Sequence, residues 1–257
     1  MFIVLNRQKI YSYIISIATV CMLFVIAGNI NTGKNAITTS ATTRQLPIYN
    51  VITDEKKVAL TMNCAWNADD IDSILSTLEK NNIKITFFIV GDWAGKYPEA
   101  VKKISEAGHE IANHSNKHPH VNKLRYEENM KEIKECSEKI KEITGNETTL
   151  YRAPYGEYNN TVIKAAKEQG HLAIQWNLDT LDYTGITGNE MWQKLESKLS
   201  NGSIILTHNG TKHTADSLEM LIKNIMNKGF KIVKVSELLY KENYIIDNNG
   251  AQKLVNV

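Results

Sequence analysis

The stretch "LTMNCAWNADD", residues 60–70, gathers groups that could do chemistry directly after an apolar run. An amide, a thiol, an indole and two carboxylates fall within eight positions, at Asn63, Cys64, Trp66, Asp69 and Asp70. Polar and reactive side chains at the end of a buried strand are typical of an active-site rim. The strand itself ends on an amide and a thiol, so this rim has no carboxylate at that point.

Several interpretations of this stretch stay open. Cys64 is either a thiolate metal ligand or a small apolar side chain packed in the core. Asn67 and Asp70 fit the N-cap and capping-box positions of a following helix, which leaves Asp69 freer to face a site. Cys64 as a nucleophile is a third alternative, but it needs an adjacent base and the sequence has no dedicated Cys–His pattern.

The stretch "ANHSNKHPH" follows another apolar run and carries His114, His118 and His120. His114 and His118 are four residues apart, so in a turn both imidazoles can face one metal ion. Imidazole suits zinc and other late first-row ions. The alternative is a pair of polar loop histidines that bind nothing.

The stretch "YRAPYGEYN" places Arg152 at the end of a short apolar run. Pro154 and Gly156 then force an exposed turn. Such a turn can present the backbone N–H of Tyr155 to a developing oxyanion. By itself this pattern also fits an ordinary turn.

Two further strand ends carry an aromatic ring, carboxylates and an imidazole. "HLAIQWNLDTLDYTG" supplies Trp176 for stacking on a sugar, and Asp179 and Asp182 for tuning a pKa. "IILTHNG" ends in His208, an imidazole able to protonate a leaving group. Capping aspartates and a core histidine are the alternatives, but five strand ends with reactive groups together predict an active or once-active site.

The elements that must position these groups alternate regularly along the chain. Short β-rich runs occur at residues 57–62, 84–90, 109–114, 149–154, 171–176, 203–208 and 231–235, with helix-like segments between them. This order predicts parallel strands with helical crossovers, in an open doubly wound sheet or a barrel. Functional groups then gather at the carboxyl ends of the strands. Cys136 recurs in a helical period with Ile133, Ile140 and Ile143 and is predicted to lie in the core.

The N-terminal segment, residues 10–30, contains no charge, and Arg7 and Lys9 precede it. Its length suffices to span a bilayer, and the flanking charges place the N-terminus in the cytoplasm. We expect a transmembrane anchor or a cleaved signal segment. The resulting division is a cytoplasmic N-terminus at 1–9, the anchor at 10–30, a linker at 31–55, a catalytic domain at 56–240 and a tail at 241–257.

The composition excludes other classes of protein. A formal net charge of +2 with scattered basic residues gives no basic patch for nucleic acid. Three cysteines form no disulfide framework.

In their order along the chain, these motifs resemble those of the polysaccharide deacetylases, carbohydrate esterases with a NodB-homology domain that remove N-acetyl groups from chitooligosaccharides, chitin or peptidoglycan. "HSNKH" is similar to the family's metal motif, "RAPYG" to its R-x-P-Y-G motif, "DTLD" to its D-x-x-D region and "LTH" to its L-x-H motif. The resemblance covers residues 56–240. It implies an α/β fold, a distorted (β/α) barrel of about seven parallel strands, here preceded by the transmembrane or signal helix.

The resemblance also implies roles for single residues. His114 and His118 would bind a divalent metal, most simply zinc, with cobalt or another late first-row metal as alternatives. His208 would be the general acid, Arg152 would hold the base, Asp179 or Asp182 would tune His208, and the N–H of Tyr155 would support the oxyanion. The substrate would contact Tyr155, Trp176, Leu206 and Trp66.

The family's first motif, T-F-D-D, aligns with "TMNC" and departs from it at both aspartates. The base falls on Asn63, whose amide cannot accept a proton near neutral pH. The metal-binding aspartate falls on Cys64, so Cys64 or Asp69 would have to complete the metal site.

We therefore expect a metal-dependent hydrolase that removes N-acetyl groups from a cell-wall or extracellular glycan, peptidoglycan included, and releases acetate. The alternative is a catalytically weak or inactive glycan-binding protein on the same scaffold. The expected partners are the glycan and the membrane, with the protein a monomer at the cell surface, or secreted if the N-terminal segment is cleaved. A role in sporulation is implied only by the resemblance.

Overall fold

A computed structural model describes residues 7–32 and 44–255, with the chain divided into two compact units, Met1–Thr43 and Arg44–Val257. In the first unit, α1 (Arg7–Thr32) is a single helix, and its apolar side chains such as Tyr13 and Phe24 are exposed. Within the described residues, hydropathy identifies no helix that could cross a membrane. The membrane anchor therefore stays a prediction.

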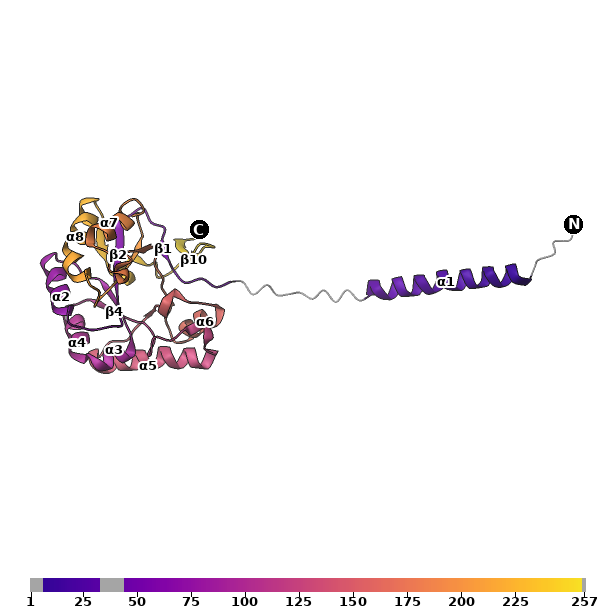
Figure 1. Ribbon diagram of the computed structural model, residues 1–257, viewed down its shortest axis with the longest axis horizontal. Coiled ribbons are helices and arrows are strands. Elements are labelled where there is room, and N and C mark those ends of the chain that lie inside the picture. Colours follow the sequence, from indigo (N-terminus) through magenta and orange to yellow (C-terminus); the bar gives the residue numbers. More distant parts are fainter. Residues whose placement is uncertain (1–6, 33–43, 256–257) are drawn as a thin grey trace. The chain divides into compact units, whose positions relative to one another are not determined.

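The second unit alternates strands and helices (Figure 1). Its helices are α2 (Ile71–Lys80), α3 (Gly91–Lys96), α4 (Pro98–Glu106), α5 (Tyr126–Thr144), α6 (Asn160–Glu168), α7 (Gly188–Glu196), α8 (Thr214–Asn227) and α9 (Val235–Leu238). Its strands are β1 (Asn50–Val51), β2 (Lys57–Cys64), β3 (Thr86–Ile89), β4 (Glu110–Asn113), β5 (Leu150–Tyr151), β6 (Leu172–Ala173), β7 (Leu178–Asp179), β8 (Ile204–His208), β9 (Lys231–Val233), β10 (Tyr244–Ile246) and β11 (Ala251–Leu254).

The main sheet has eight strands in the order β6-β5-β4-β3-β2-β8-β7, and β9 also pairs with β2. All its strand pairs are parallel. This confirms the predicted distorted (β/α) barrel. Each of the seven predicted β-rich runs contains an observed strand, and β7 is an additional short strand after β6. Because β6 and β7 are the two ends of the order, the ring of strands is open between them.

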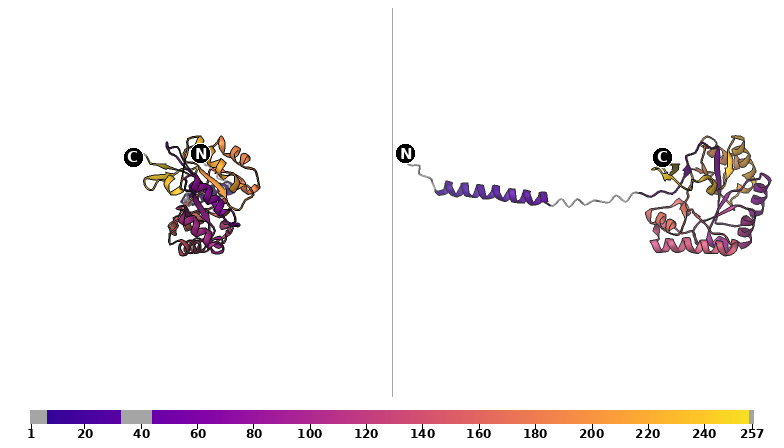
Figure 2. Two further views of the ribbon diagram at one scale, coloured as in Figure 1. Left: turned by 90° about the vertical axis from the view of Figure 1, so that its left-hand side faces the viewer. Right: turned by 180° about the vertical axis from the view of Figure 1, so that it is seen from behind.

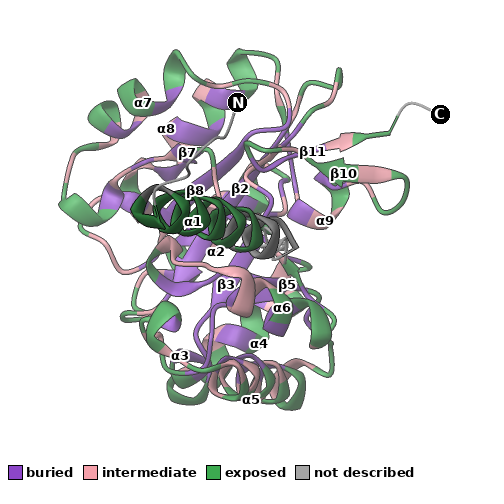
Figure 3. Cartoon of the chain, turned by 90° about the vertical axis from the view of Figure 1, so that its right-hand side faces the viewer, coloured by how far each residue is buried: buried purple, intermediate pink, exposed green. Residues whose placement is uncertain are grey.

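Helices pack around this sheet on the outside, with α7 and α8 at the top of Figure 1 and α5 at the bottom; Figure 2 gives the view from behind. β2 is buried along almost its whole length, as expected for a central parallel strand. Helix α5 turns Ile133, Cys136 and Ile140 inward at helical spacing, so the prediction of Cys136 as a core residue is confirmed. In Figure 3 the central strands are purple and the helices are green on their outer sides.

The C-terminal segment was predicted to be a polar tail, and for residues 244–254 this is wrong. β10 and β11 form an antiparallel pair, and β11 pairs in parallel with β1, which gives a separate three-stranded sheet. Part of the predicted linker is ordered as well, because Ile48 is buried and bridges to Ile174. Backbone hydrogen bonding between these distant segments, which no local pattern encodes, holds both in place.

Candidate active site

A cavity of about 490 Å³ opens at the carboxyl ends of the parallel strands. Its walls are formed by Asn63, Ala65, Trp66, His114, His118, Ala153, Tyr155, Gly156, Trp176, Asp179, Tyr183, Leu206 and His208. Nine of these thirteen residues had been assigned to a site from the sequence. The prediction that five strand ends meet on one face is confirmed.

The strand register explains which side chains face this cavity. Asn63 at the end of β2 pairs with His208 at the end of β8, so these two side chains lie on the same face of the sheet. Leu206 lies two residues before His208 on that face and reaches the wall. Cys64, one position further along β2, must point to the opposite face.

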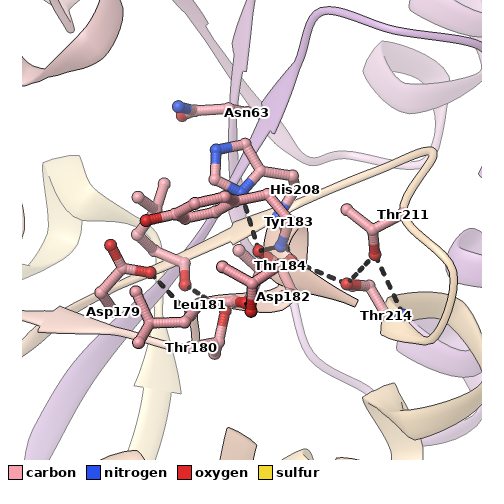
Figure 4. A network of polar contacts seen from close by, with 12 residues as sticks. Asn63, Asp179, Thr180, Leu181, Asp182, Tyr183, Thr184, His208, Thr211 and Thr214 are labelled. Carbon is pink, nitrogen blue, oxygen red and sulfur yellow. Dashed lines mark hydrogen bonds and ion pairs between the residues drawn. The ribbon is translucent and has the colours of Figure 1, made fainter. Parts of the chain in front are cut away.

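His208 and Asp182 form a hydrogen-bonded pair at the cavity wall. The His208 Nδ1 lies 2.8 Å from Oδ1 of Asp182, and a carboxylate can only accept there, so Nδ1 carries the proton. This leaves Nε2 on the ring edge that Figure 4 shows turned away from Asp182, on the side of Asn63. When this ring is doubly protonated, Nδ1–H stays on Asp182 and Nε2–H is the proton that His208 can give to a group in the cavity.

Asp182 is fully buried, and each of its oxygens accepts two hydrogen bonds. Its two oxygens also accept from the backbone N–H of His208 at 2.6 Å, the Thr214 hydroxyl at 2.7 Å and the N–H of Tyr183 at 3.0 Å (Figure 4). Of the two aspartates predicted to tune His208, the structure places Asp182 against it. Asp179 instead lines the cavity, accepts from the N–H of Leu181, and has its pKa raised by burial.

Arg152 is fully buried beneath Asn63. Its Nη1 donates to Oδ1 of Asn63 and to the Thr61 hydroxyl, each at 2.9 Å, and its Nη2 donates to the carbonyl of Gln175 at 3.1 Å. Its hydrogen bonds in the structure go to an amide, a hydroxyl and a carbonyl. Burial lowers the pKa of this guanidinium to about 9.

The contact with Arg152 fixes which way the Asn63 amide faces. A guanidinium has donors and no acceptor, so the Asn63 oxygen must be the atom that meets it. The free end of the amide is then its NH₂ group. Asn63 therefore presents a hydrogen-bond donor to its other neighbours, where a carboxylate would present an acceptor.

His114 and His118 face each other in the cavity wall, with ring centroids 5.0 Å apart. Nδ1 of His114 lies 2.8 Å from the Arg152 carbonyl, which can only accept, so Nδ1 carries the proton and Nε2 keeps its lone pair. Burial is the main cause that lowers the pKa of both histidines. Neutral imidazole with Nδ1–H on a backbone carbonyl is the form in which histidine binds metals.

These two imidazoles fit two of the protein ligands of a metal site. Catalytic zinc is usually held by three protein ligands, and among the described residues no group of three His, Cys, Asp or Glu side chains is arranged to hold a metal. The structure does not bring Cys64 or Asp69 to the histidines. Cys64 is buried in the apolar cluster with Met62 and Leu60, and Asp69 is exposed outside the cavity wall. The placement of Cys64 fits the alternative in which it is a small apolar side chain packed in the core. Burial also raises the pKa of its thiol well above the ordinary value.

The capping-box interpretation of "NADD" is wrong. Asp70, rather than Asn67, occupies the N-cap position of α2 and makes no side-chain cap hydrogen bond. Its carboxylate instead accepts from the N–H of Gly210 at 2.7 Å and from the Asn209 amide at 3.1 Å. The loop after β2 is thereby tied to the loop that follows His208, a contact that needs the β2–β8 pairing.

The cavity rim is aromatic. Trp66, Tyr155 and Tyr183 are 49%, 60% and 51% exposed, and the rings of Trp66 and Tyr183 lie 5.3 Å and 5.5 Å from that of His208. Tyr155 has a left-handed backbone, φ 59°, and stacks on His120. Large exposed rings around a polar floor suit the apolar faces of a sugar.

The sequence had not singled out Tyr183, Thr214 or Glu132. Tyr183 follows Asp182 directly and could have been noticed as an aromatic next to a candidate carboxylate. Thr214 lies 32 residues from the Asp182 that it contacts, and Glu132 lies on α5 beside the loop between the two histidines. Only the fold brings these two to the site.

Comparison with known proteins identifies the family. The polysaccharide deacetylase profile matches residues 50–174. The peptidoglycan-N-acetylglucosamine deacetylase of Bacillus cereus is 30% identical over 189 residues, which are 72% of this chain and 69% of that protein. The chain belongs to the polysaccharide deacetylase family. The uncharacterized protein YlxY of Bacillus subtilis is 34% identical over 193 residues, and the match covers 75% of this chain but only 60% of YlxY.

This polysaccharide deacetylase family member is also similar to a solved structure. BA3943 from Bacillus anthracis is described as a CE4 family pseudoenzyme. It matches with a TM-score of 0.73 and 29% identity, over 81% of this chain and 70% of that chain. A BA3943 mutant is described as having restored enzymatic activity.

Proposed function

We propose that this chain removes N-acetyl groups from a cell-wall glycan and releases acetate. The observation that carries this proposal is the His208–Asp182 pair, which faces the same cavity as His114 and His118. The family membership and the peptidoglycan deacetylase of Bacillus cereus support the reaction class. The exposed aromatic rim supports a sugar as the ligand.

His114 and His118 would hold a divalent ion, most simply zinc, through their Nε2 atoms. When bound, such an ion supplies Lewis acidity toward the acetamide carbonyl and toward water. With two protein ligands the site would bind the ion more weakly than a three-ligand site.

The chain's own residues would handle protons and position the substrate. His208, held by Asp182, donates a proton from Nε2 to the leaving amine nitrogen. The N–H of Tyr155 donates to the developing oxyanion, and Leu206 and Trp176 pack against the acetyl group and the sugar. Asn63 cannot accept the proton of the attacking water. Asp179 is the carboxylate in the cavity wall, and its raised pKa suits it to accept that proton.

A second candidate function is glycan binding without hydrolysis. The specific observation in its favour is the Arg152–Asn63 contact, because the amide oxygen is held by a donor and no base stands at the end of β2. The description of BA3943 as a pseudoenzyme is consistent with this candidate. The cavity and its aromatic rim serve binding equally well.

Acetate release and glycan binding separate the two candidates. We would incubate the purified domain with N-acetylglucosamine oligomers and with peptidoglycan in added zinc or cobalt, and measure acetate and, separately, binding by calorimetry. Acetate that disappears in His208→Ala and in His114→Ala supports the deacetylase. Binding without acetate under any metal supports the glycan-binding protein, and neither binding nor acetate overturns both.

We also propose that the protein acts as a monomer at the outer face of the cell membrane through its N-terminal segment, or is secreted if that segment is cleaved. Residues 10–30 carry no charge, which is the basis of this proposal. Fractionation of cells into membrane, cytosol and medium tests it, and recovery in the cytosol would contradict it.

A further inference from the structure

The short loop between the two histidines of the cavity is held by a carboxylate from a helix. Oε2 of Glu132 on α5 accepts from the Ser115 hydroxyl at 2.6 Å, from the N–H of Asn116 at 3.0 Å and from the N–H of Lys117 at 2.8 Å. One oxygen atom therefore meets three donors that lie between His114 and His118.

The backbone N–H groups of this loop resemble an anion-binding site, and the carboxylate of Glu132 occupies the place of the anion. Ser115 has a left-handed backbone, φ 69°, and so does His118, φ 56°. Such a turn points successive N–H groups toward one spot, which attracts an anion. A non-glycine residue in this conformation is strained, so the loop needs other contacts to hold it. The carboxylate of Glu132 supplies them at the spot where the N–H groups converge.

Other contacts also hold the loop: the Ser115 N–H donates to Oδ1 of Asn113 at 2.8 Å, and the Asn116 side-chain amide donates to Oε2 of Glu135 at 2.8 Å. The N–H groups of Gly91 and Asp92, at the start of α3, donate to the carbonyls of Ser115 and Asn116 at 2.9 Å and 2.8 Å. These bonds hold the carbonyl side of the loop, whereas Glu132 holds its N–H side. Losing Glu132 would leave the N–H groups of Asn116 and Lys117 without this acceptor.

We propose that Glu132 is a positioning residue that sets the relative placement of the His114 and His118 imidazoles, and through it the affinity of the pair for a divalent metal. Glu132 itself lies outside the cavity wall and acts only through the loop. The metal part of this proposal rests on the proposed function, but the placement of the rings does not.

Glu132→Ala and Glu132→Gln test the proposal, with Glu138→Gln as the matched control. Glu138 lies on the same helix and is exposed, and its Oε1 is 3.7 Å from Nζ of Lys134. Glutamine keeps one oxygen that can accept the same three bonds without the charge, so Glu132→Gln should lose less than Glu132→Ala. Thermal unfolding of each variant checks that the domain is folded.

Two measurements on the full chain are needed. Titration with Co²⁺, followed by visible absorption, should show affinity about 10- to 100-fold lower in Glu132→Ala, an intermediate value in Glu132→Gln and no change in Glu138→Gln. Imidazole ¹⁵N NMR without metal should show His114 as the single Nδ1–H tautomer in the unaltered protein and as a mixture in Glu132→Ala.

A negative result in one measurement can be told apart from a negative result in the other. No Co²⁺ binding by the unaltered protein would overturn the metal part of the proposed function, and the NMR comparison would still decide the role of Glu132. An unchanged His114 tautomer in a folded Glu132→Ala protein would overturn the positioning role. So would Co²⁺ affinity equal to that of the unaltered protein.

Discussion

At the scale of single residues, the contact between Asn63 and Arg152 distinguishes this cavity from one with a carboxylate at the end of β2. Arg152 is fully buried, and its hydrogen bonds go to neutral acceptors. Asp179 acts on the Arg152 charge without a hydrogen bond to it, whereas a carboxylate at position 63 would pair with the guanidinium directly and provide a proton acceptor.

Asn63→Asp should therefore raise acetate release. A general base contributes about 10²–10⁴-fold to such reactions, so we expect an increase of about 10²-fold or more with N-acetylglucosamine oligomers. Asn63→Ala is the matched control, because it removes the amide without adding a carboxylate. Equal rates for Asn63→Asp and Asn63→Ala would show that a base at this position is not what limits the reaction.

Asp182→Asn should lower both stability and acetate release. Each oxygen of Asp182 accepts two donors, so an NH₂ group in either place meets N–H or O–H donors. Leaving a buried donor without its acceptor costs about 1–3 kcal/mol, and acetate release should fall by about 10²-fold or more. Urea unfolding and acetate assays measure the two effects. The control is Asp72→Asn, at an exposed ion pair with Lys103, which should change neither stability nor acetate release. An Asp182→Asn protein with unchanged stability and activity would contradict the role of the His208–Asp182 pair.

At the scale of elements, the cavity depends on how closely α3 approaches the loop that follows β4. α3 begins at Gly91, whose N–H donates to the carbonyl of Ser115. A Cβ at Gly91 would lie 2.4 Å from Oδ1 of Asn116, 3.1 Å from Cα of Asn116 and 3.2 Å from Cα of Cys136. The close approach therefore requires a glycine although its backbone is not left-handed.

Gly91→Ala should push this loop away from α3. Overpacking of this kind typically costs about 1–3 kcal/mol, and we expect a loss in that range by urea unfolding, with faster amide hydrogen exchange in residues 114–118. Gly95→Ala is the control, since a Cβ at Gly95 meets nothing within 4 Å. Equal losses in the two variants would mean that α3 can shift freely.

At the scale of the whole molecule, buried neutral histidines make stability depend on pH. Burial, with further effects from Lys84 and Lys234, lowers the pKa of His109 from 6.5 to about 4. Its Nδ1 accepts from the N–H of Ile85 at 3.1 Å, so the neutral form is the one that the fold uses. Burial also lowers the pKa of His171.

The free energy of unfolding should fall as the pH is lowered from 6.5 to about 4. In that range the unfolded chain binds a proton at His109 and the folded chain does not, so acid favours unfolding; above pH 6.5 the contribution is fully present. Each pKa unit corresponds to about 1.4 kcal/mol. His109→Asn keeps an acceptor for the Ile85 N–H and removes the titration, so urea unfolding between pH 4 and 7 should show a shallower slope. A slope equal to that of the unaltered protein would exclude His109 as its source.

The sequence by itself determined the elements and the types of the reactive groups. The apolar runs and their helical connections specified parallel strands, and parallel strands place their carboxyl ends on one edge; this is why His114, His208 and Asn63 could be predicted to meet. Helical period placed Cys136 in the core. These are local patterns combined with one general rule of sheet geometry.

The tertiary structure decided which of these groups touch. Asp179 and Asp182 are equivalent in the sequence, and only the packing of the η3 turn (Asp182–Thr184) against β8 assigns Asp182 to His208. The Asn63 amide is oriented by Arg152, 89 residues away. Strand register turns Cys64 into the core, and the fold brings Glu132 to the histidine loop. Such contacts depend on how precisely distant segments are placed relative to one another. Strand register and packing set that placement, and residue types alone do not.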